Sequence, residues 1–147
     1  MNIVEKLDIS SIKSIHKSIM SEGANSTYRV EPVYCVSRDN RKIVFTSPEL
    51  IESKLDSLLG LFNTYLTEVK NTKDLSKVLG IFWVGFISIH PFSDGNGRTA
   101  KKIIKSYTGL ASLNFLDQYL IEGNAKSDIQ ALSNQFYNQL SHIGEKV

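Results

Sequence analysis

The 147-residue sequence predicts a mostly α-helical single domain that carries one small β-hairpin. Three observations lead to this prediction. Apolar residues recur at the three- and four-residue spacing of a helix face along most of the chain. Two short runs rich in β-forming residues, 28–37 and 43–45, flank a polar turn at 38–41. A chain of this length buries roughly 68–70% of its unfolded surface, so it can hold a core without disulfides or metals.

The first predicted elements are an amphipathic helix over about residues 9–21 and the hairpin over about 33–46. Ile12 and Ile15 lie on the apolar face of this helix. Pro32 indicates an edge position or a late start for the first strand, because proline lacks the N–H that a central strand donates. Since a two-stranded hairpin is too small to form a core, it must rest on the helices.

The middle of the chain contains two long predicted helices. The Ser47-Pro48 pair is typical of a helix start, with an N-cap followed by a proline at the first helical position. Asp74 is expected to cap the second helix, which carries the apolar run 78–89. Pro91 ends that helix, because the residue before a proline avoids the helical conformation. The run is shorter than the ~20 residues that cross a bilayer, so we expect it in the core.

The C-terminal part adds a helix over about 97–111, a short helix within 113–122 and a last helix over about 127–143. No repeat or break in composition divides the chain. We therefore predict one domain over residues 1–147, with its core at about 9–143.

The composition excludes several classes of protein. The 17 Lys and Arg residues against 15 Asp and Glu give a net charge of +2, which favours neither a nucleic-acid binder nor a membrane binder. The single cysteine, Cys35, excludes a disulfide framework and a cysteine-based metal site. The N-terminus lacks the apolar run of a signal peptide, so we expect a cytoplasmic location.

One segment, His90–Lys102, combines several features that point to chemistry. His90 lies at the end of an apolar helix, and an imidazole titrates near neutral pH, so it can act as a general base. Asp94 could hold Mg²⁺, which often takes one or two carboxylates and completes its shell with phosphates and water. Gly95-Asn96-Gly97 lets backbone N–H groups converge where the next helix begins, which favours an anion.

The helix after this loop is basic on one face. Arg98, Lys101, Lys102 and Lys105 share that face. Cations in the first turns of a helix oppose its dipole, at a cost of roughly 0.3–1 kcal/mol each. A polyphosphate at the helix start would convert this cost into attraction.

Each feature alone has a plainer interpretation: a histidine near a helix end, an Asp-Gly-Asn-Gly turn, or a solvated basic face. An EF-hand is excluded, because Thr99 stands where the loop needs glycine and Lys105 where it needs glutamate. A Walker A loop is also excluded, because its G-x-x-x-x-G-K-[ST] pattern does not occur. The combination of all three features in one short segment favours a phosphate site with a base beside it.

The segment resembles the signature of the Fic family, H-x-F-x-[DE]-G-N-G-R-x-x-R. The matching positions are His90, Phe92, Asp94, Gly95, Asn96, Gly97 and Arg98. Lys101 departs from the pattern, because the family has arginine there. Weaker similarity at Ile15-His16, Tyr28-Arg29 and Ser47–Ile51 extends the resemblance over nearly the whole chain.

The resemblance implies a Fic-type helical core with a hairpin "flap", and the transfer of AMP from ATP to a Ser, Thr or Tyr hydroxyl of a target protein. His90 would take the proton from that hydroxyl. Asp94 would hold Mg²⁺ on the phosphates. The backbone of Gly95-Asn96-Gly97 would bind the phosphates with help from the Asn96 side chain. Phe92 would pack the loop in place.

Two cations would complete the nucleotide site in this interpretation. Arg98 would pair with the β- and γ-phosphates. Lys101 would replace the arginine that contacts the γ-phosphate, keeping the charge but losing the forked geometry. We therefore expect weaker or altered nucleotide preference, and a different nucleotide donor, removal of AMP, or a catalytically weak nucleotide-binding regulator stay open as alternatives.

The resemblance also implies partners. An extended segment of the target would add to an open strand edge at Ile43–Thr46 and bring its hydroxyl to His90. The segment Ser18–Gly23 matches the family's short inhibitory pattern [ST]-x-x-x-E-[GN], with Glu22 as its glutamate. If Glu22 does not inhibit, an antitoxin-like protein could do so. A cytosolic toxin and an effector delivered into a host cell would look alike.

Overall fold

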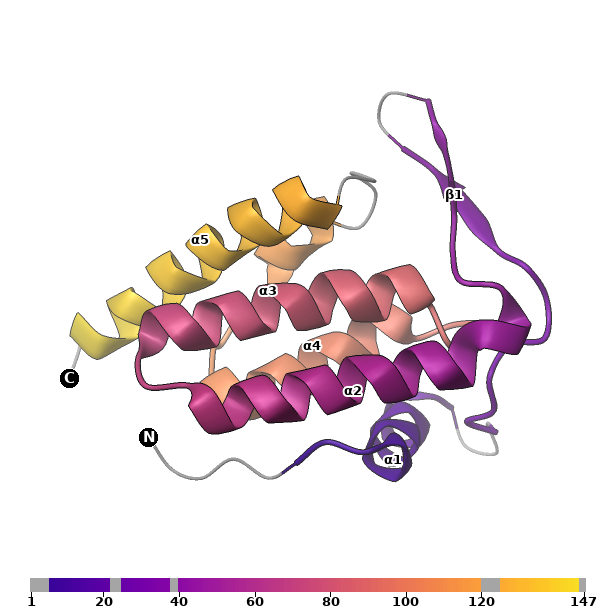
Figure 1. Ribbon diagram of the computed structural model, residues 1–147, viewed down its shortest axis with the longest axis horizontal. Coiled ribbons are helices and arrows are strands. Elements are labelled where there is room, and N and C mark those ends of the chain that lie inside the picture. The colour runs from indigo at the N-terminus through magenta and orange to yellow at the C-terminus, as the bar shows by residue number, and fades with distance from the viewer. Residues whose placement is uncertain (1–5, 22–24, 38–39, 120–124, 146–147) are drawn as a thin grey trace.

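The computed structural model describes residues 6–21, 25–37, 40–119 and 125–145. It confirms the predicted fold class: a helical body with one two-stranded antiparallel hairpin (Figure 1). In chain order the elements are α1 (Ile9–Ile19), β1 (Tyr34–Val36), β2 (Lys42–Val44), the short 3₁₀ helix η1 (Pro48–Leu50), α2 (Ile51–Glu68), α3 (Thr72–Ile89), α4 (Asn96–Thr108), the 3₁₀ helix η2 (Asn114–Tyr119) and α5 (Ala125–Glu145).

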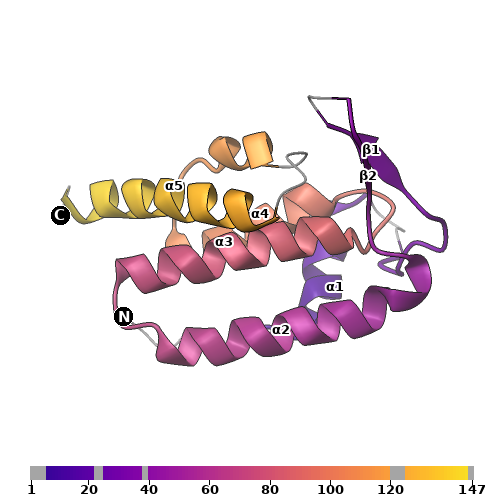
Figure 2. The ribbon, with the colours of Figure 1, turned by 45° about the horizontal axis from the view of Figure 1, so that its top comes forward.

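Helix α3 forms the centre of the core. It carries the apolar run that the sequence predicts to be buried, and Phe82, Trp83 and Phe86 are completely inaccessible to solvent. Figure 2 shows α3 between α5 and α2. Burial of each large apolar side chain contributes about 1.5–3 kcal/mol, so the many buried side chains of this helix contribute strongly to stability. Within the described part of the chain, no helix is long and apolar enough to cross a membrane.

Two predicted helix boundaries are wrong. Asn71, not Asp74, is the N-cap of α3, because the Asn71 side chain accepts a hydrogen bond from the Asp74 N–H at 2.8 Å. Asp74 instead lies in the first turn of the helix, where a negative charge favours the helix dipole. Helix α4 ends at Thr108, three residues before the predicted end, because Gly109 takes a left-handed conformation with φ of 68°.

The hairpin is shorter than the predicted span of 33–46. Its three residue pairs join Tyr34 to Val44, Cys35 to Ile43 and Val36 to Lys42. Part of the predicted turn falls on residues 38 and 39, outside the described residues. In Figure 1 the hairpin projects from the helical body at the end where α3 stops and α2 begins. This position brings its base beside the loop that follows α3.

Candidate functional site

Helix α3 ends at His90, a residue with an unusual backbone conformation. His90 caps the helix with φ of 52° and ψ of 61°, a left-handed conformation that few residues other than glycine adopt. Its N–H still bonds the Phe86 carbonyl of the last turn, at 2.9 Å. The left-handed turn directs the chain away from the helix axis, and Pro91 then prevents any return to helix.

The His90 ring lies between α3 and the hairpin. It stacks on the Phe45 ring with a centroid separation of 4.1 Å and an interplanar angle of 11°. Nδ1 lies 3.3 Å from the Ile87 carbonyl, which can only accept a hydrogen bond, so this contact favours a proton on Nδ1 and a lone pair on Nε2. Burial lowers the pKa of His90, the Arg29 charge lowers it further, and the Ile87 carbonyl opposes both effects. The site thus favours a neutral imidazole, the form that a general base requires.

The loop after His90 is held from inside by Asn96 and Phe92. The Asn96 side chain accepts from the Phe92 N–H at 2.9 Å and donates to the Phe92 carbonyl at 2.7 Å. Both side-chain groups of Asn96 are therefore used within the protein, and a phosphate contact from this residue would come from its backbone N–H. Phe92 is buried and stacks on His16 at a centroid separation of 3.8 Å.

His16 on α1 supports the same loop from the other side. Its Nε2 donates to the Asp94 carbonyl at 2.8 Å, and Nδ1 lies 2.8 Å from the Ser26 hydroxyl. The sequence placed His16 in the family resemblance but gave it no role. Its signal was weak, because a histidine one turn after Ile12 on an apolar helix face predicts burial and not the partner 78 residues away.

The two loop glycines have different surroundings. Gly95 has φ of 84°, and an added Cβ would lie 2.7 Å from the Met20 sulfur and 3.3 Å from His16 Nε2. No other residue fits there without strain. Gly97, in the first turn of α4, faces open space, with nothing within 4 Å of an added Cβ. The loop is therefore closely packed at Gly95 and open at Gly97.

Helix α4 begins with free donors beside that space. Its N-cap, Gly95, has no side chain to satisfy the first turn. The N–H groups of Asn96, Gly97 and Arg98 find no acceptor among the residues that the structure describes. Free N–H groups and the positive end of the helix dipole are the features of a helix start that favour an anion.

A comparison with known protein families agrees with this geometry. The profile described as "Fic/DOC family" matches residues 6–107, which is more than half of the chain and includes α1, the hairpin, His90 and the loop. The chain belongs to the Fic/DOC family. The family match covers every residue that the sequence predicted for the site.

Two curated relatives match this Fic/DOC chain over part of their length. A Fido domain-containing protein of Dictyostelium discoideum is 36% identical over 85 residues, 56% of this chain and 51% of the relative. A protein of Ostreid herpesvirus 1 named ribonucleoside-diphosphate reductase small chain is 29% identical over 111 residues, 67% of this chain and 19% of that protein. The chain thus spans about half or less of the curated relatives that it matches.

Solved structures share the fold. A Fic domain-containing signalling protein from Bacteroides thetaiotaomicron superposes with a TM-score of 0.67 at 21% identity, covering 91% of this chain and 59% of that one. A Fic family protein from Desulfovibrio desulfuricans superposes with a TM-score of 0.64 at 15% identity, covering 92% of this chain and 46% of that one.

The basic side chains of α4 in this Fic/DOC chain have partners in different parts of the fold. Arg98 stays at the loop, where it pairs with Asp94 Oδ2 at 3.3 Å on the exposed side. Lys101 does not reach the loop, because its Nζ lies 2.6 Å from Asp117 Oδ1 on η2. Lys102 Nζ donates to the Ser18 hydroxyl of α1 at 2.8 Å. Arg98 thus has its contact at the loop and Lys101 has its contact on η2, and the phosphate roles predicted for both side chains stay predictions.

Asp94 has the exposure that a Mg²⁺–nucleotide ligand needs. One carboxylate oxygen accepts from the Gly95 N–H at 2.8 Å and the other pairs with Arg98. The described residues contain no group of three His, Cys, Asp or Glu side chains that could hold a metal by themselves. A single carboxylate suits an ion that takes its other ligands from phosphates and water.

The outer edge of β2, in the hairpin beside His90, is open over part of its length. The Phe45 N–H bonds the Val33 carbonyl across the hairpin at 3.1 Å. Because inward and outward backbone groups alternate along an antiparallel strand, those of Lys42 and Val44 point away from β1. Thr46, which the sequence included in the open edge, donates its N–H to the Ser88 carbonyl at 3.1 Å and is not available. The usable edge is therefore shorter than predicted.

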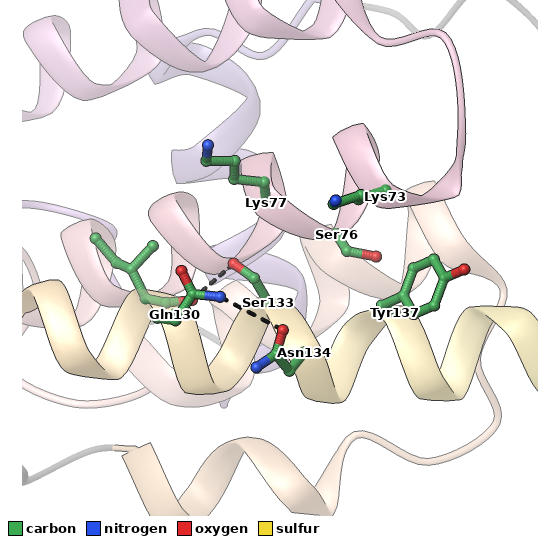
Figure 3. A pocket seen from close by; sticks show the side chains of 8 residues that line it. Lys73, Ser76, Lys77, Gln130, Ser133, Asn134 and Tyr137 are labelled. Atoms are coloured by element: carbon green, nitrogen blue, oxygen red, sulfur yellow. Dashed lines mark hydrogen bonds between the residues drawn. The ribbon is translucent and has the colours of Figure 1, made fainter.

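A second hollow lies elsewhere, between α3 and α5 (Figure 3). It has a volume of about 530 Å³ and contains no residue of the loop. Its lining residues are Lys73, Ser76, Lys77, Ile129, Gln130, Ser133, Asn134 and Tyr137. Since those of α3 come from its first half, this pocket is separate from the site at His90.

Proposed function

We propose that this Fic/DOC protein is a protein adenylyltransferase. It would transfer AMP from ATP to a Ser, Thr or Tyr hydroxyl of a target protein and release pyrophosphate. The observation that carries the proposal is the arrangement of a neutral-favouring imidazole, His90, directly before a loop that ends in free N–H donors at Gly97 and its neighbours. A base and an anion site side by side are what the attack of a hydroxyl on a phosphate requires.

His90 would act on the acceptor. With the Nδ1 proton held by Ile87, Nε2 can accept the proton of the incoming hydroxyl as its oxygen attacks the α-phosphorus. General base catalysis of this kind contributes about 10²–10⁴-fold to a rate. The lowered pKa of His90 keeps the base in its active form at neutral pH.

The phosphates would be bound by the start of α4. Its free N–H groups are fixed before the substrate arrives, and fixed donors stabilise developing charge without reorganisation. Arg98 and Asp94 pair with each other on the exposed side of the loop. On binding, Arg98 would turn to the phosphates and Asp94 to the Mg²⁺, which neutralises phosphate charge when bound.

The target would bind at the edge of β2. An extended segment can add to the backbone groups of Lys42 and Val44 by strand addition. Its side chains would then lie near Phe45, the residue that stacks on His90. The predicted target protein and antitoxin-like inhibitor both stay predictions, and Glu22 lies outside the described residues.

The ion pair of Lys101 with Asp117 favours one second candidate. With Lys101 held on η2, the site offers fewer cations to a third phosphate than the family pattern implies. A transferase that uses another nucleotide donor would need no such contact. Removal of AMP and a nucleotide-binding regulator are not favoured by any particular contact.

Incubation with a panel of nucleotides distinguishes these functions. The protein is mixed with ATP, GTP, CTP, UTP or CDP-choline, with Mg²⁺ or with a chelator, and its own modification and that of added cell extract are read by mass spectrometry. We expect an AMP adduct from ATP that disappears with the chelator. An adduct from another nucleotide would show that this nucleotide, and not ATP, is the donor. Nucleotide binding without any adduct would support the catalytically weak regulator.

A further inference from the structure

Arg29 is a buried arginine whose hydrogen bonds all go to backbone carbonyls. Only 4% of its surface is exposed. Its guanidinium donates to the carbonyls of His90 at 2.6 Å, Glu31 at 2.9 Å and Ile89 at 3.1 Å, and also to that of Thr46. Its backbone N–H donates to the Pro91 carbonyl at 2.9 Å. A cation costs free energy to bury, so a position that only filled space would favour an apolar residue.

The four carbonyls belong to two parts of the molecule. Ile89 and His90 form the end of α3, where the last carbonyls have no partner within the helix and the helix dipole favours a cation. Glu31 precedes β1 and Thr46 follows β2, so both lie at the base of the hairpin. One planar guanidinium therefore joins the hairpin base to the end of the helix that carries the imidazole. Lysine could not do this, because it lacks the fork of donors.

The His90 conformation depends on its surroundings. A left-handed residue other than glycine persists only where the rest of the structure holds it. Here the Arg29 Nε–H fixes the His90 carbonyl, and Phe45 fixes the ring by stacking. The Thr46 N–H donates to the Ser88 carbonyl on α3, so the segment after β2 that carries Phe45 is also hydrogen-bonded to the helix.

We propose that Arg29 is the positioning residue that sets the distance between the hairpin edge and the His90 imidazole. A target segment bound along β2 then presents its hydroxyl to Nε2 in one fixed geometry. Because the guanidinium bonds described above all go to backbone carbonyls, Arg29 would act by positioning His90 and the hairpin and not on the nucleotide. This inference rests on the proposed function in so far as His90 is the base and β2 the docking edge.

The test compares Arg29→Lys with Arg41→Lys, the same change at an exposed arginine of the hairpin. Arg29→Lys should lower kcat by about 10- to 100-fold, the effect of misplacing a reacting group by about 1 Å. Binding of a non-hydrolysable ATP analogue should change less than about twofold, because the α4 donors are untouched. Arg41→Lys should change neither value. Equal kcat values for the two variants would overturn the proposal.

Two readouts need no transfer activity, so they separate this proposal from the proposed function. In Arg29→Lys, the NMR signals of the His90 ring should shift and the Thr46 N–H should exchange faster, whereas Arg41→Lys should leave both unchanged. If wild type modifies nothing while these changes occur, the proposed function fails and the structural link stands. Unchanged signals in Arg29→Lys would overturn the link.

Wild type supplies a further measurement in case Arg29→Lys does not fold. Native-state hydrogen exchange should give the Arg29 Nε–H and the Thr46 N–H the same opening free energy, because both bonds belong to one unit. The Ile43 N–H, within the ladder, should open at lower free energy. Exchange of the Thr46 N–H together with the Ile43 N–H, while the Arg29 Nε–H stays protected, would contradict the proposal.

Discussion

The loop after α3 and the hairpin lie beside each other but are built differently. In the loop, the Phe92 ring is buried, the Asn96 side chain bonds both the N–H and the carbonyl of Phe92, and His16 Nε2 donates to the Asp94 carbonyl. The hairpin has three residue pairs, and Tyr34 and Val44 expose 59% and 65% of their surface. The hairpin is held to the helices at its base, by Arg29 and the backbone of Thr46.

Under the proposed function, this difference would separate two tasks. Chemistry on a phosphate needs donors and a base that do not move, and the packed loop would supply them. Binding an extended segment needs free backbone groups, and a two-stranded ladder that is only marginally stable alone supplies those. The following changes should therefore act on one region without the other.

The largest effect should come from His90→Ala. We expect the transfer rate to fall by about 10²–10⁴-fold, because the general base is lost, while the affinity for nucleotide and the exchange of the β2 amides stay near wild type. His142→Ala, a histidine on α5, is the matched control and should keep full activity. A His90→Ala protein with more than about a tenth of the activity would show that another group takes the proton.

Gly95→Ala and Gly97→Ala should separate the stability of the loop from its ligand space. Gly95→Ala should lower the free energy of unfolding by about 1–3 kcal/mol, because of its left-handed φ and the contact with Met20. Gly97→Ala should leave unfolding within about 1 kcal/mol of wild type and weaken nucleotide binding, since its methyl group enters the open space. Chemical denaturation and calorimetry measure the two quantities. Equal nucleotide affinities for Gly97→Ala and wild type would place the phosphates elsewhere.

His16→Ala and Tyr34→Ala compare the two regions directly. Removing His16 leaves the Asp94 carbonyl without its donor and Phe92 without its stacking partner. The free energy of unfolding should therefore fall by about 1–3 kcal/mol. Tyr34→Ala, on the exposed face of the hairpin, should change it by less than about 0.5 kcal/mol. Thermal and denaturant unfolding check both. Similar losses would mean that the hairpin contributes as much to stability as the loop.

The pH dependence of the rate should reflect the burial of His90. Because burial lowers the pKa of His90, the imidazole stays neutral to a pH below the ordinary histidine value of about 6.5, and the acidic limb of the rate should be centred below that value. Arg29→Gln should move the acidic limb of kcat toward higher pH, because it removes the positive charge that lowers this pKa. An acidic limb centred above pH 6.5 in wild type would contradict the burial argument.

The smallest effect should come from Asp117→Asn, which lies outside both regions. Breaking its ion pair frees Lys101 to approach a bound triphosphate, so the affinity for ATP should rise by a few-fold, the size expected for a largely exposed pair. The affinity for ADP should change less. Glu49→Gln, on η1, serves as a control for the loss of one surface carboxylate. A drop in ATP affinity in Asp117→Asn would show that the pair stabilises the site.

Most of the fold could be predicted because it follows local patterns. Apolar spacing within each helix located α1, α2, α3 and α5 to within a few residues, and Pro91 marked the end of α3. The cap of α3 was misplaced because Asn71 and Asp74 are both good caps three residues apart, and only the backbone decides between them. Local pattern therefore predicts elements better than their ends.

Less of the candidate site could be predicted from local sequence patterns. The loop residues share one short segment, so their proximity needed no tertiary information. The ion pair of Lys101 with Asp117 on η2 could not be predicted, and the phosphate role expected for Lys101 stays a prediction. Neither His16 nor Arg29 received a function, because their partners lie 78 and 61 residues away. Contacts over such distances leave no periodic signal in one sequence.

The central claim is that the phosphates of ATP lie over Gly97 beside His90, so that the α-phosphorus is attacked. The most direct measurement incubates the protein and Mg²⁺ with ATP labelled either at the α- or at the γ-phosphate and follows the label in protein. Label from the α-phosphate alone, lost in His90→Ala, is the predicted result. Label from the γ-phosphate, or none from either with cell extract present, would contradict the claim.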